Sequence, residues 1–450
     1  MVRALFLSRP RGPTRTWTTM TTIADRSTAE LADLRAQARA AYDAFKARGL
    51  KLDMTRGKPA PEQLDLATGM LALPGNGDYT TAAGEDARNY GGQQGLPELR
   101  ALFSHLIDAP ADQIVVGGNS SLALMHDTIV WALLKGVPGS ERPWSKEEEP
   151  VFLCPVPGYD RHFALCEEFG IRMIPVPMTG QGPDMDVVEA FVANPAVKGM
   201  WCVPKYANPS GEIFSDETVR RLAAMKTGAP DFRLFWDNAY AVHHLTPDRH
   251  PVRDILAACA EAGHPDRPFL YASTSKITLA GAGLAVFAGS PENTRWFLAR
   301  SAKQTIGPDK LNQLRHVRFL RDAAGLQAHM DAHRALIAPK FAAVQEALER
   351  HLAGTGAARW TRPEGGYFIT VEARAGTATE VVRLAKEAGI ALTPAGATSP
   401  YGRDPQDSVL RLAPTFPSLG DVTKAAEGIA LCILLASLEA EQGVRARNAA

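Results

Sequence analysis

The chain has 450 residues, of which 45% are hydrophobic and 22% charged, a composition typical of globular proteins with room for two domains. Its 49 basic and 49 acidic residues cancel, which argues against a nucleic-acid-binding protein because such proteins usually have a basic surplus. The five cysteines form no CxxC or CxxH pair, so no zinc site, other metal site or disulfide framework is predicted. Reduced thiols and the lack of a membrane-spanning apolar run favour a cytoplasmic protein that binds no membrane.

Residues 1–26 differ in composition from the rest of the chain. They contain four arginines before the first acidic residue, Asp25, as transit peptides do. A disordered tail, or a start codon upstream of a true start at Met20, explains the same composition. We favour these two explanations and expect residues 1–26 to be a disordered N-terminal extension.

From Ser27 the chain alternates between helical and extended patterns. Apolar residues recur every three or four positions up to Gly49, which predicts a helix, and a loop region rich in glycine and proline follows to Gly95. Between 113 and 289, short apolar runs alternate with amphipathic stretches, which predicts a mostly parallel sheet with helices on both faces. The expected strands are 113–118, 150–155, 172–176, 199–204, 233–237, 268–273 and 284–289, and the expected helices include 120–136, 160–170, 183–194 and 215–226.

The remaining chain predicts linking helices and a second, smaller α/β unit. The stretch 309–352 is interrupted only by Gly325 and Pro339 and predicts two or more helices. Residues 359–442 predict the α/β unit, with a helix that starts in a capping box from Thr377 to Glu380. The helix after Ser27 is expected to pack on this unit. The predicted division is 1–26 for the extension, 27–75 for the N-terminal part of the small domain, 76–308 for the large domain, and 309–450 for the linking helices and the rest of the small domain.

Several polar residues come directly after predicted strands, at the edge where parallel sheets bind ligands. The run Gly117-Gly118-Asn119-Ser120-Ser121 opens a helix and predicts an anion site, although a serine there can also simply cap the helix. Tyr159 is expected either to stack on a flat ligand or to pack in the core, and Asn208 either to bind a ligand or to form a type I turn. Asp237 ends an apolar strand, where a buried carboxylate requires a cationic partner.

Lys276 follows Ser273-Thr274-Ser275 and precedes a run of small residues. A lysine that forms a Schiff base needs a site that lowers its pKa, and the adjacent hydroxyls can bind a phosphate. Together with the anion site, the aromatic ring and the carboxylate, these residues match the requirements of pyridoxal 5'-phosphate. His243 and His244 have no third ligand at a metal-like spacing, so we expect them to be surface histidines.

The motifs NYGGQQGLPELR, PGY, ANPSG, DNAY, STSK, PEGGYF and VLRLAPTF follow one another along the chain. In these motifs the chain resembles the fold-type-I, class I aminotransferases that depend on pyridoxal phosphate, and most of all the type Ic aspartate aminotransferases of bacteria. The resemblance extends from Ser27 to Gln442. It implies a large domain with a mostly parallel central sheet flanked by helices, and a smaller α/β domain formed by both chain ends.

The resemblance also implies roles for individual residues. Lys276 resembles the lysine that forms the internal aldimine and then transfers protons, and Asp237 resembles the acid that keeps the pyridine nitrogen protonated. Asn208 and Tyr240 would bind the 3-oxygen of the ring, and Tyr159 would stack on the ring. The cofactor phosphate would be bound by Asn119, Ser120, Ser121, Ser273 and Ser275, together with Tyr90 from a neighbouring subunit, which implies a homodimer with shared active sites.

The substrate side of the site follows from the same resemblance. Arg411 matches the arginine that binds the substrate α-carboxylate, because a guanidinium fork suits a carboxylate; the alternative is an edge arginine in a solvated ion pair. Gly57 fits a mobile glycine-containing segment near the substrate, and Asn208 would also face the substrate. One departure is Gly283, which stands where the family has an arginine that binds the phosphate. Lys303 and Lys310 are the candidates to replace it.

The implied reaction is a ping-pong transfer of an amino group from L-aspartate to 2-oxoglutarate, through a Lys276 aldimine and pyridoxamine phosphate. The candidates for binding the distal carboxylate of these substrates are Arg161, Lys205, Lys310 and Arg315. The alternatives are an aminotransferase for an aromatic amino acid, alanine or a branched amino acid, or a β-lyase that uses the same cofactor. A regulator that binds the cofactor without catalysis is disfavoured, because Lys276 and Arg411 are retained and the stretch before Ser27 is too short for a DNA-binding domain.

Overall fold

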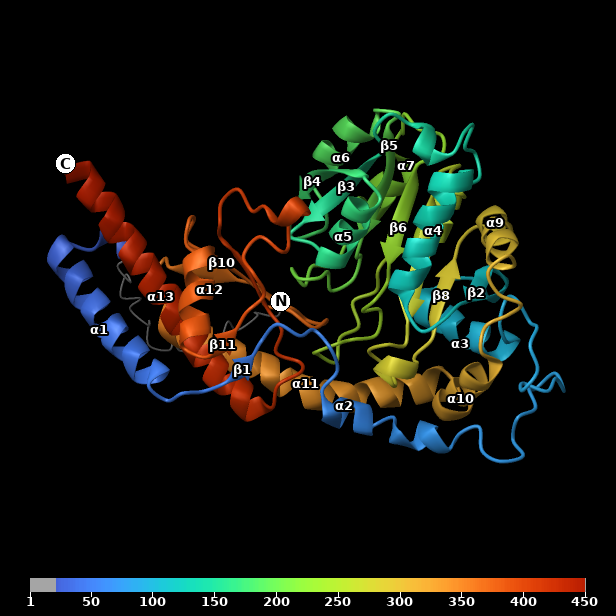
Figure 1. Ribbon diagram of the computed structural model, residues 1–450, viewed down its shortest axis with the longest axis horizontal. Helices are drawn as coiled ribbons and strands as arrows, with labels where there is room; N and C mark the ends of the chain where they lie inside the picture. The colour runs from blue at the N-terminus through green and yellow to red at the C-terminus, as the bar shows by residue number, and fades with distance from the viewer. Residues whose placement is uncertain (1–21, 450) are drawn as a thin grey trace, which may run out of the picture.

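A seven-stranded sheet forms the centre of the larger part of the molecule in the computed structural model, which describes residues 22–449 (Figure 1). The strand order is β2-β8-β7-β6-β5-β3-β4, and β8 alone runs antiparallel to its neighbours, so the predicted mostly parallel sheet is confirmed. The strands are β2 (Ile114–Val116), β3 (Val151–Val156), β4 (Arg172–Pro177), β5 (Val197–Cys202), β6 (Arg233–Asp237), β7 (Pro268–Ser273) and β8 (Ala285–Ala288).

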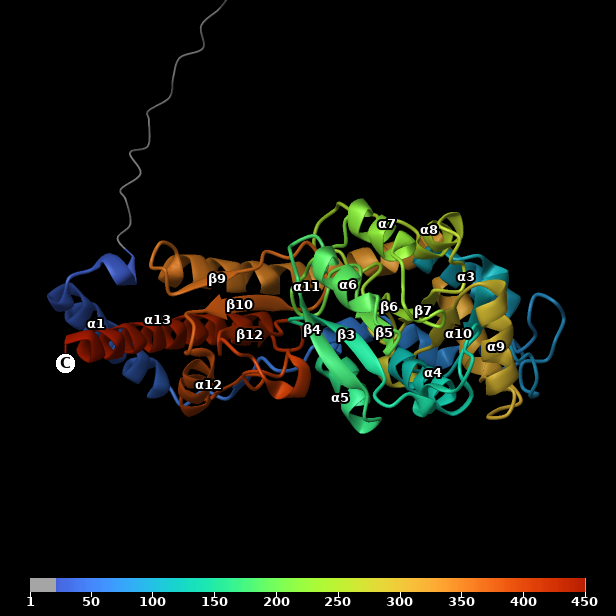
Figure 2. The same cartoon turned by 90° about the horizontal axis from the view of Figure 1, so that it is seen from above.

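Helices cover both faces of this sheet, because its central strands β5 to β8 are buried along their whole length and present apolar side chains to either side (Figure 2). One face packs on α3 (Pro97–Ile107), α6 (Met185–Val192), α7 (Asp216–Ala224), α8 (Ile255–Glu261) and α10 (Lys310–Leu320). The other face packs on α4 (Ser121–Lys135), α5 (Asp160–Glu168) and α9 (Pro291–Ser301).

The smaller part contains segments from both chain ends. Strand β1 (Leu52–Asp53) pairs with β11 (Ile390–Ala391), and a three-stranded sheet has the order β12-β10-β9, with β9 (Ala358–Trp360), β10 (Ile369–Ala373) and β12 (Val409–Leu412). The helices are α1 (Thr28–Lys46), α2 (Pro61–Asp65), α11 (Ala323–Leu352), α12 (Ala378–Glu387) and α13 (Leu419–Ala449). Both α1 and α11 pack along α13, so the N-terminal helix joins the C-terminal unit as predicted (Figure 1).

The long helix α11 connects the two parts along one side of the molecule (Figure 1). Its start, including Leu326 and Met330, packs in the core of the large sheet, which therefore continues past residue 308. Its end, from Phe341 onward, packs in the core of the smaller part. Two or more helices are predicted for the stretch 309–352, but the break between them does not fall at Gly325 or Pro339, since α11 continues through both residues. It falls before α11, where Asp322 caps the helix by accepting a hydrogen bond from the Gly325 N–H.

Two local predictions need correction. The predicted extension over 1–26 ends too late, since Ile23–Asp25 forms a 3-10 helix and Ile23 is buried; residues 1–21 lie outside the described part. Helix α12 does begin after Thr377, but the hydroxyl of Thr377 donates to the Arg374 carbonyl, so no capping box forms.

The other short 3-10 helices are Thr68–Ala72, Ala111–Gln113, Trp144–Lys146, Ala280–Ala282 and Pro400–Gly402. Over residues 22–449, no helix has both the length and the apolar character that crossing a membrane requires.

Candidate active site

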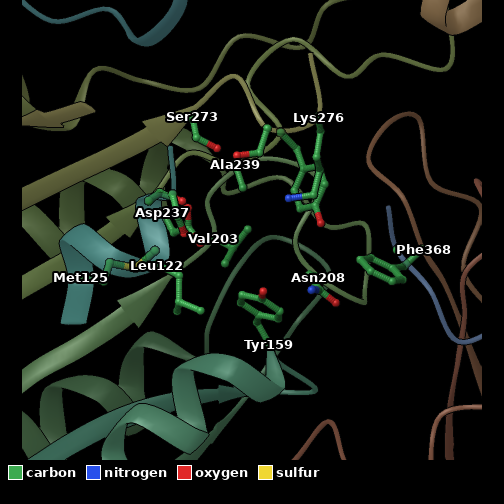
Figure 3. Close-up of a pocket in the computed structure, with 15 residues that line it drawn as sticks. Leu122, Met125, Tyr159, Val203, Asn208, Asp237, Ala239, Ser273, Lys276 and Phe368 are labelled. Carbon is green, nitrogen blue, oxygen red and sulfur yellow. The ribbon is translucent and has the colours of Figure 1, made fainter. Parts of the chain in front are cut away.

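A cavity of about 200 Å³ lies at the carboxyl ends of the parallel strands of the large sheet. The residues that follow β3, β5, β6 and β7 meet there with the start of α4, because these strand ends share one edge of the sheet. The smaller part contributes Gly57 and Phe368 to the lining. Phe368 lies across the cavity from Asp237 (Figure 3). The predicted residues that line the cavity are Gly57, Ser120, Ser121, Tyr159, Asn208, Asp237, Tyr240, Ser273, Ser275 and Lys276.

The amine of Lys276 points into this cavity, with Asp237 on one side and Phe368 on the other (Figure 3). Burial lowers the pKa of Lys276, and the nearby charge of Asp237 opposes this shift only in part. Its ammonium group lies 4.9 Å from the ring centroid of Tyr240. A lysine whose neutral form is favoured in this way can act as a nucleophile and as a base.

Asp237 ends β6 and is buried against His162 on α5. Its Oδ2 lies 3.1 Å from Nε2 of His162, and the imidazole stacks on Trp201 at 4.2 Å between ring centroids. The other carboxylate oxygen, Oδ1, is buried without a hydrogen-bond partner among the described residues. The carboxylate is therefore positioned by a histidine and has one oxygen available for a ligand.

A group of hydroxyls lines the cavity at the start of α4. Ser120 caps this helix through the Ala123 N–H at 3.4 Å, and the side chain of Ser275 donates to the Asn119 carbonyl at 3.0 Å. Asn119 itself does not line the cavity, and its side chain lies 3.4 Å from the Gly281 carbonyl. Serine hydroxyls at a helix N-terminus form a suitable environment for a phosphate.

Neither Lys303 nor Lys310 takes the place of the phosphate-binding arginine that the resemblance implies at position 283. A Cβ atom at Gly283 would lie 3.2 Å from the Ser275 nitrogen and the Thr274 hydroxyl, so the site leaves little room for a side chain there. Lys310 is buried and forms an ion pair with Glu85. Lys303 is exposed, and neither lysine lines the cavity.

Three polar or aromatic side chains surround the space next to Lys276. Burial raises the pKa of Tyr159 to about 12 and raises that of Tyr240 far above its ordinary value, so both hydroxyls keep their protons. The Oδ1 atom of Asn208 is buried and has no hydrogen-bond partner among the described residues. Tyr240 and Asn208 can therefore donate to and accept from a bound ligand, while Tyr159 offers a ring face.

Arg411 lies on β12 behind Phe368, outside the residues that line the cavity. Its guanidinium carbon lies 5.1 Å from the centroid of the Phe368 ring, and Nη1 donates to Asp160 Oδ1 at 2.9 Å. Tyr90 also lies outside the cavity, and 77% of its surface is exposed in the single chain.

The four candidates for a distal carboxylate site differ in their surroundings. Lys310 is paired with Glu85, and Arg315 donates to the Leu73 carbonyl at 2.9 Å. Lys205 lines a separate cavity of about 60 Å³, and burial lowers its pKa to about 8. Arg161 is exposed in the first turn of α5, two residues after Tyr159.

The backbone that carries Lys276 is bound by side chains that sequence reasoning missed. The Lys276 carbonyl accepts from the Tyr367 hydroxyl at 3.3 Å and lies 3.2 Å from Nε2 of His243. The next carbonyl, of Ile277, lies 2.6 Å from Nε2 of His329. Tyr367 lies in the PEGGYF motif, but nothing local in the sequence links these residues to Lys276.

The prediction that His243 and His244 are surface residues is wrong. Both are buried, and Nδ1 of His244 lies 2.7 Å from the Tyr206 hydroxyl. Burial lowers the pKa of His243 well below its ordinary value, so it is neutral and serves as a hydrogen-bonding group. His162 was also missed; it lies in the first turn of α5, and its ring centroid is 4.9 Å from that of Tyr159, the residue before the helix.

Comparisons with known proteins identify the family of the chain. The sequence pattern of the aspartate amino-transferase family matches residues 26–445. An aspartate aminotransferase of Corynebacterium glutamicum is 50% identical over 398 residues, which cover 88% of this chain and 92% of that protein. A Mycolicibacterium smegmatis protein is 54% identical over 405 residues, which cover 89% of this chain and 95% of that protein.

Solved structures that resemble this chain are also aminotransferases. The crystal structure of an aspartate transaminase from Corynebacterium glutamicum has a TM-score of 0.92 at 48% identity and covers 94% of this chain and 100% of that chain. The α-aminoadipate aminotransferase LysN of Thermus thermophilus, complexed with N-(5'-phosphopyridoxyl)-L-leucine, has a TM-score of 0.69 at 22% identity, with 89% of this chain and 95% of that chain covered, and shares the fold. The chain belongs to the aspartate aminotransferase family and is an aminotransferase with the fold of type I pyridoxal-phosphate enzymes.

Proposed function

We propose that the protein uses pyridoxal 5'-phosphate to transfer an amino group from L-aspartate to 2-oxoglutarate by a ping-pong mechanism. The observation that carries this proposal is a cavity in which the amine of Lys276 faces Asp237, whose Oδ1 has no hydrogen-bond partner among the described residues. Pyridoxal phosphate supplies an electron sink for the substrate α-carbon and carries the amino group between the two half-reactions. L-aspartate as the donor is supported by the names of relatives at about half identity, and 2-oxoglutarate as the acceptor follows from the family resemblance of the motifs.

The residues of the cavity fit this cofactor. Two buried oxygens, Asp237 Oδ1 and Asn208 Oδ1, have no hydrogen-bond partner within residues 22–449, and such atoms are costly unless a ligand satisfies them. Asp237 would contact the ring nitrogen, Asn208 and Tyr240 the ring oxygen, and Tyr159 the ring face. Ser120, Ser121, Ser273 and Ser275, together with Asn119, would surround the phosphate next to the N-terminus of α4.

Lys276 would hold the cofactor covalently and, once free, move a proton at the substrate α-carbon. The lowered pKa of its amine supports both roles, because a neutral amine can accept that proton. Asp237 would stabilise positive charge on the ring nitrogen, and His162 would hold the carboxylate in position for this. Closure by Gly57 and Phe368 would exclude water from the reacting atoms.

Arg411 would bind the substrate α-carboxylate through its guanidinium fork. For the distal carboxylate we propose Arg161, since Lys310 and Arg315 have partners elsewhere and Lys205 lines a different cavity. Arg161 instead follows Tyr159 closely at the start of α5 and is exposed.

We further propose a cytoplasmic homodimer in which Tyr90 reaches the active site of the neighbouring subunit. Tyr90 is 77% exposed and Ile306 is 66% exposed in the single chain. The two residues belong to one surface, because a Cβ atom at Gly307 would collide with the backbone of Gly91. An exposed apolar surface of this kind is typical of a protein–protein interface.

The absorbance of the purified holoenzyme, measured before and after addition of L-aspartate without an acceptor, tests the proposed reaction. We expect aspartate to shift the band of the bound cofactor and 2-oxoglutarate to restore it, while the Lys276→Ala variant does not show this cycle. If the band does not change with aspartate but shifts with an aromatic amino acid, alanine or a branched amino acid, the substrate assignment is wrong and that amino acid takes its place. A chain that takes up no cofactor would contradict the proposal as a whole.

A further inference from the structure

The guanidinium of Arg411 already contacts a carboxylate of the protein. Nη1 donates to Oδ1 of Asp160 at 2.9 Å, and Nη2 lies 3.4 Å from the hydroxyl of Thr393. The Nε atom is buried without a hydrogen-bond partner among the described residues. The guanidinium thus has one acidic partner in the described part of the chain, bound at a single nitrogen.

The burial of the two partners is unequal. The side chain of Arg411 is 8% exposed, whereas that of Asp160 is 35% exposed. A buried guanidinium without a counter-ion is costly, so Arg411 requires a negative charge when no substrate is bound. The carboxylate of Asp160 is stable without Arg411, because water reaches it.

The position of Asp160 lowers the free-energy cost of breaking its ion pair with Arg411. Asp160 is the first residue of α5, and the positive end of the helix dipole stabilises a carboxylate there. A ligand carboxylate has an advantage over Asp160, since it can contact two nitrogens of the fork where Asp160 contacts one.

We propose that Asp160 is the resident counter-ion of Arg411, which the α-carboxylate of the incoming substrate replaces. The inference rests on the proposed role of Arg411 in substrate binding. Asp160 is then an affinity-determining residue: it neutralises Arg411 in the empty site, and each substrate must compete with it.

The exchange also involves the two parts of the molecule. Asp160 belongs to α5 on the large sheet, while Arg411 belongs to β12 of the smaller part. The same boundary contains a backbone hydrogen bond of 2.8 Å from the Gly158 N–H to the Thr398 carbonyl. Replacement of Asp160 by a substrate therefore removes one ionic contact between the parts and leaves the backbone contact in place.

The experiment compares the holoenzyme with its Asp160→Asn variant, using succinate as an unreactive carboxylate. The dissociation constant is measured from the absorbance of the bound cofactor, and the melting temperature is measured with and without succinate. We expect Asp160→Asn to bind succinate about fivefold more tightly, the scale of a partly exposed ion pair. The melting temperature without ligand should fall, and its rise on adding succinate should exceed that of the wild type.

Weaker succinate binding by Asp160→Asn would show that the carboxylate orients Arg411 for its ligand, and unchanged binding would show that it does not compete. Either result overturns the proposal. Asp160→Glu retains the charge and should keep the wild-type affinity, which provides a second test if Asp160→Asn does not fold. The matched control is Glu372→Gln. Glu372 lies on the neighbouring strand β10 and pairs with Arg359 on β9, so its substitution removes a carboxylate from an ion pair elsewhere and should not change succinate binding.

The Arg411→Lys variant separates this proposal from the proposed function. If Arg411→Lys loses succinate binding while Asp160→Asn does not gain it, Arg411 binds the carboxylate and only the counter-ion proposal fails. If Arg411→Lys binds succinate as the wild type does, the role of Arg411 itself is wrong.

Discussion

Asp237 shows how much a single residue depends on its neighbours. Its carboxylate is buried next to a catalytic lysine candidate, contacts His162 through one oxygen and leaves the other oxygen free. The stacking of His162 on Trp201 holds the imidazole in one orientation. The carboxylate is thus held in place before any ligand binds, which is the condition for strong electrostatic stabilisation of a charge that persists through the reaction.

The variant Asp237→Asn retains the shape of the side chain and removes its charge. We expect kcat to fall by about 10²–10³-fold, because the bound ring nitrogen loses the anion that stabilises its positive charge. The cofactor should remain bound, as judged by absorbance. Asp184→Asn, which alters the cap of α6, should leave kcat unchanged, and a value within a few-fold of the wild type for Asp237→Asn would contradict the assigned role.

At the scale of elements, the segment that contains Gly57 packs directly on the residues that precede β10. A Cβ atom at Gly57 would collide with the ring of Phe368, which lines the cavity and lies beneath the guanidinium of Arg411. The backbone conformation of Gly57 is one that other residues adopt as well, so conformation alone does not require glycine here. Glycine is required because a side chain would prevent the close approach of the two segments. The position of Phe368, and through it that of Arg411, depends on this contact between two segments distant in the sequence.

The variant Gly57→Ala should therefore displace Phe368. We expect KM for aspartate to rise about tenfold and stability to fall by about 1–3 kcal/mol, the usual cost of overpacking. Steady-state kinetics and thermal unfolding provide the two measurements. Gly69→Ala is the matched control, because a Cβ atom there meets no neighbour within 4 Å; equal effects of the two substitutions would refute this interpretation of Gly57.

At the scale of the whole molecule, one chain leaves a candidate site residue exposed on its surface. Tyr90 is far more exposed than a binding residue should be, and the exposed Ile306 lies on the same surface. Within one chain, Lys276 is the only cation that lines the described cavity, so the hydroxyls there have no partner that neutralises a phosphate. A second copy that contributes Tyr90 would explain the exposure of this residue and would add a hydroxyl donor for the phosphate.

Mixing two inactive variants tests this arrangement. We expect Lys276→Ala and Tyr90→Ala to be impaired separately, and a refolded mixture to regain activity. In the mixed dimer, one of the two sites would combine an intact Lys276 with an intact Tyr90 from its partner. A mixture that stays as inactive as its components, while chromatography shows that the chains have exchanged, would rule out a shared site.

Local sequence alone determined the elements and the chemistry of the strand ends. The apolar runs of β5, β6 and β7 predict buried parallel strands, and the carboxyl ends of such strands meet at one edge. For this reason Asp237 and Lys276, found after separate runs, were expected in one site and lie in one cavity. The division into domains at particular residues stays a prediction.

Tertiary structure alone decided which of these side chains touch. Asp160 pairs with Arg411 across 251 positions of sequence, and Lys310 pairs with Glu85 across 225. His243, expected at the surface, is buried and lies within hydrogen-bonding distance of the Lys276 carbonyl. Periodicity reports only which face of an element is apolar, whereas such contacts depend on strand order and on how helices from both chain ends pack together.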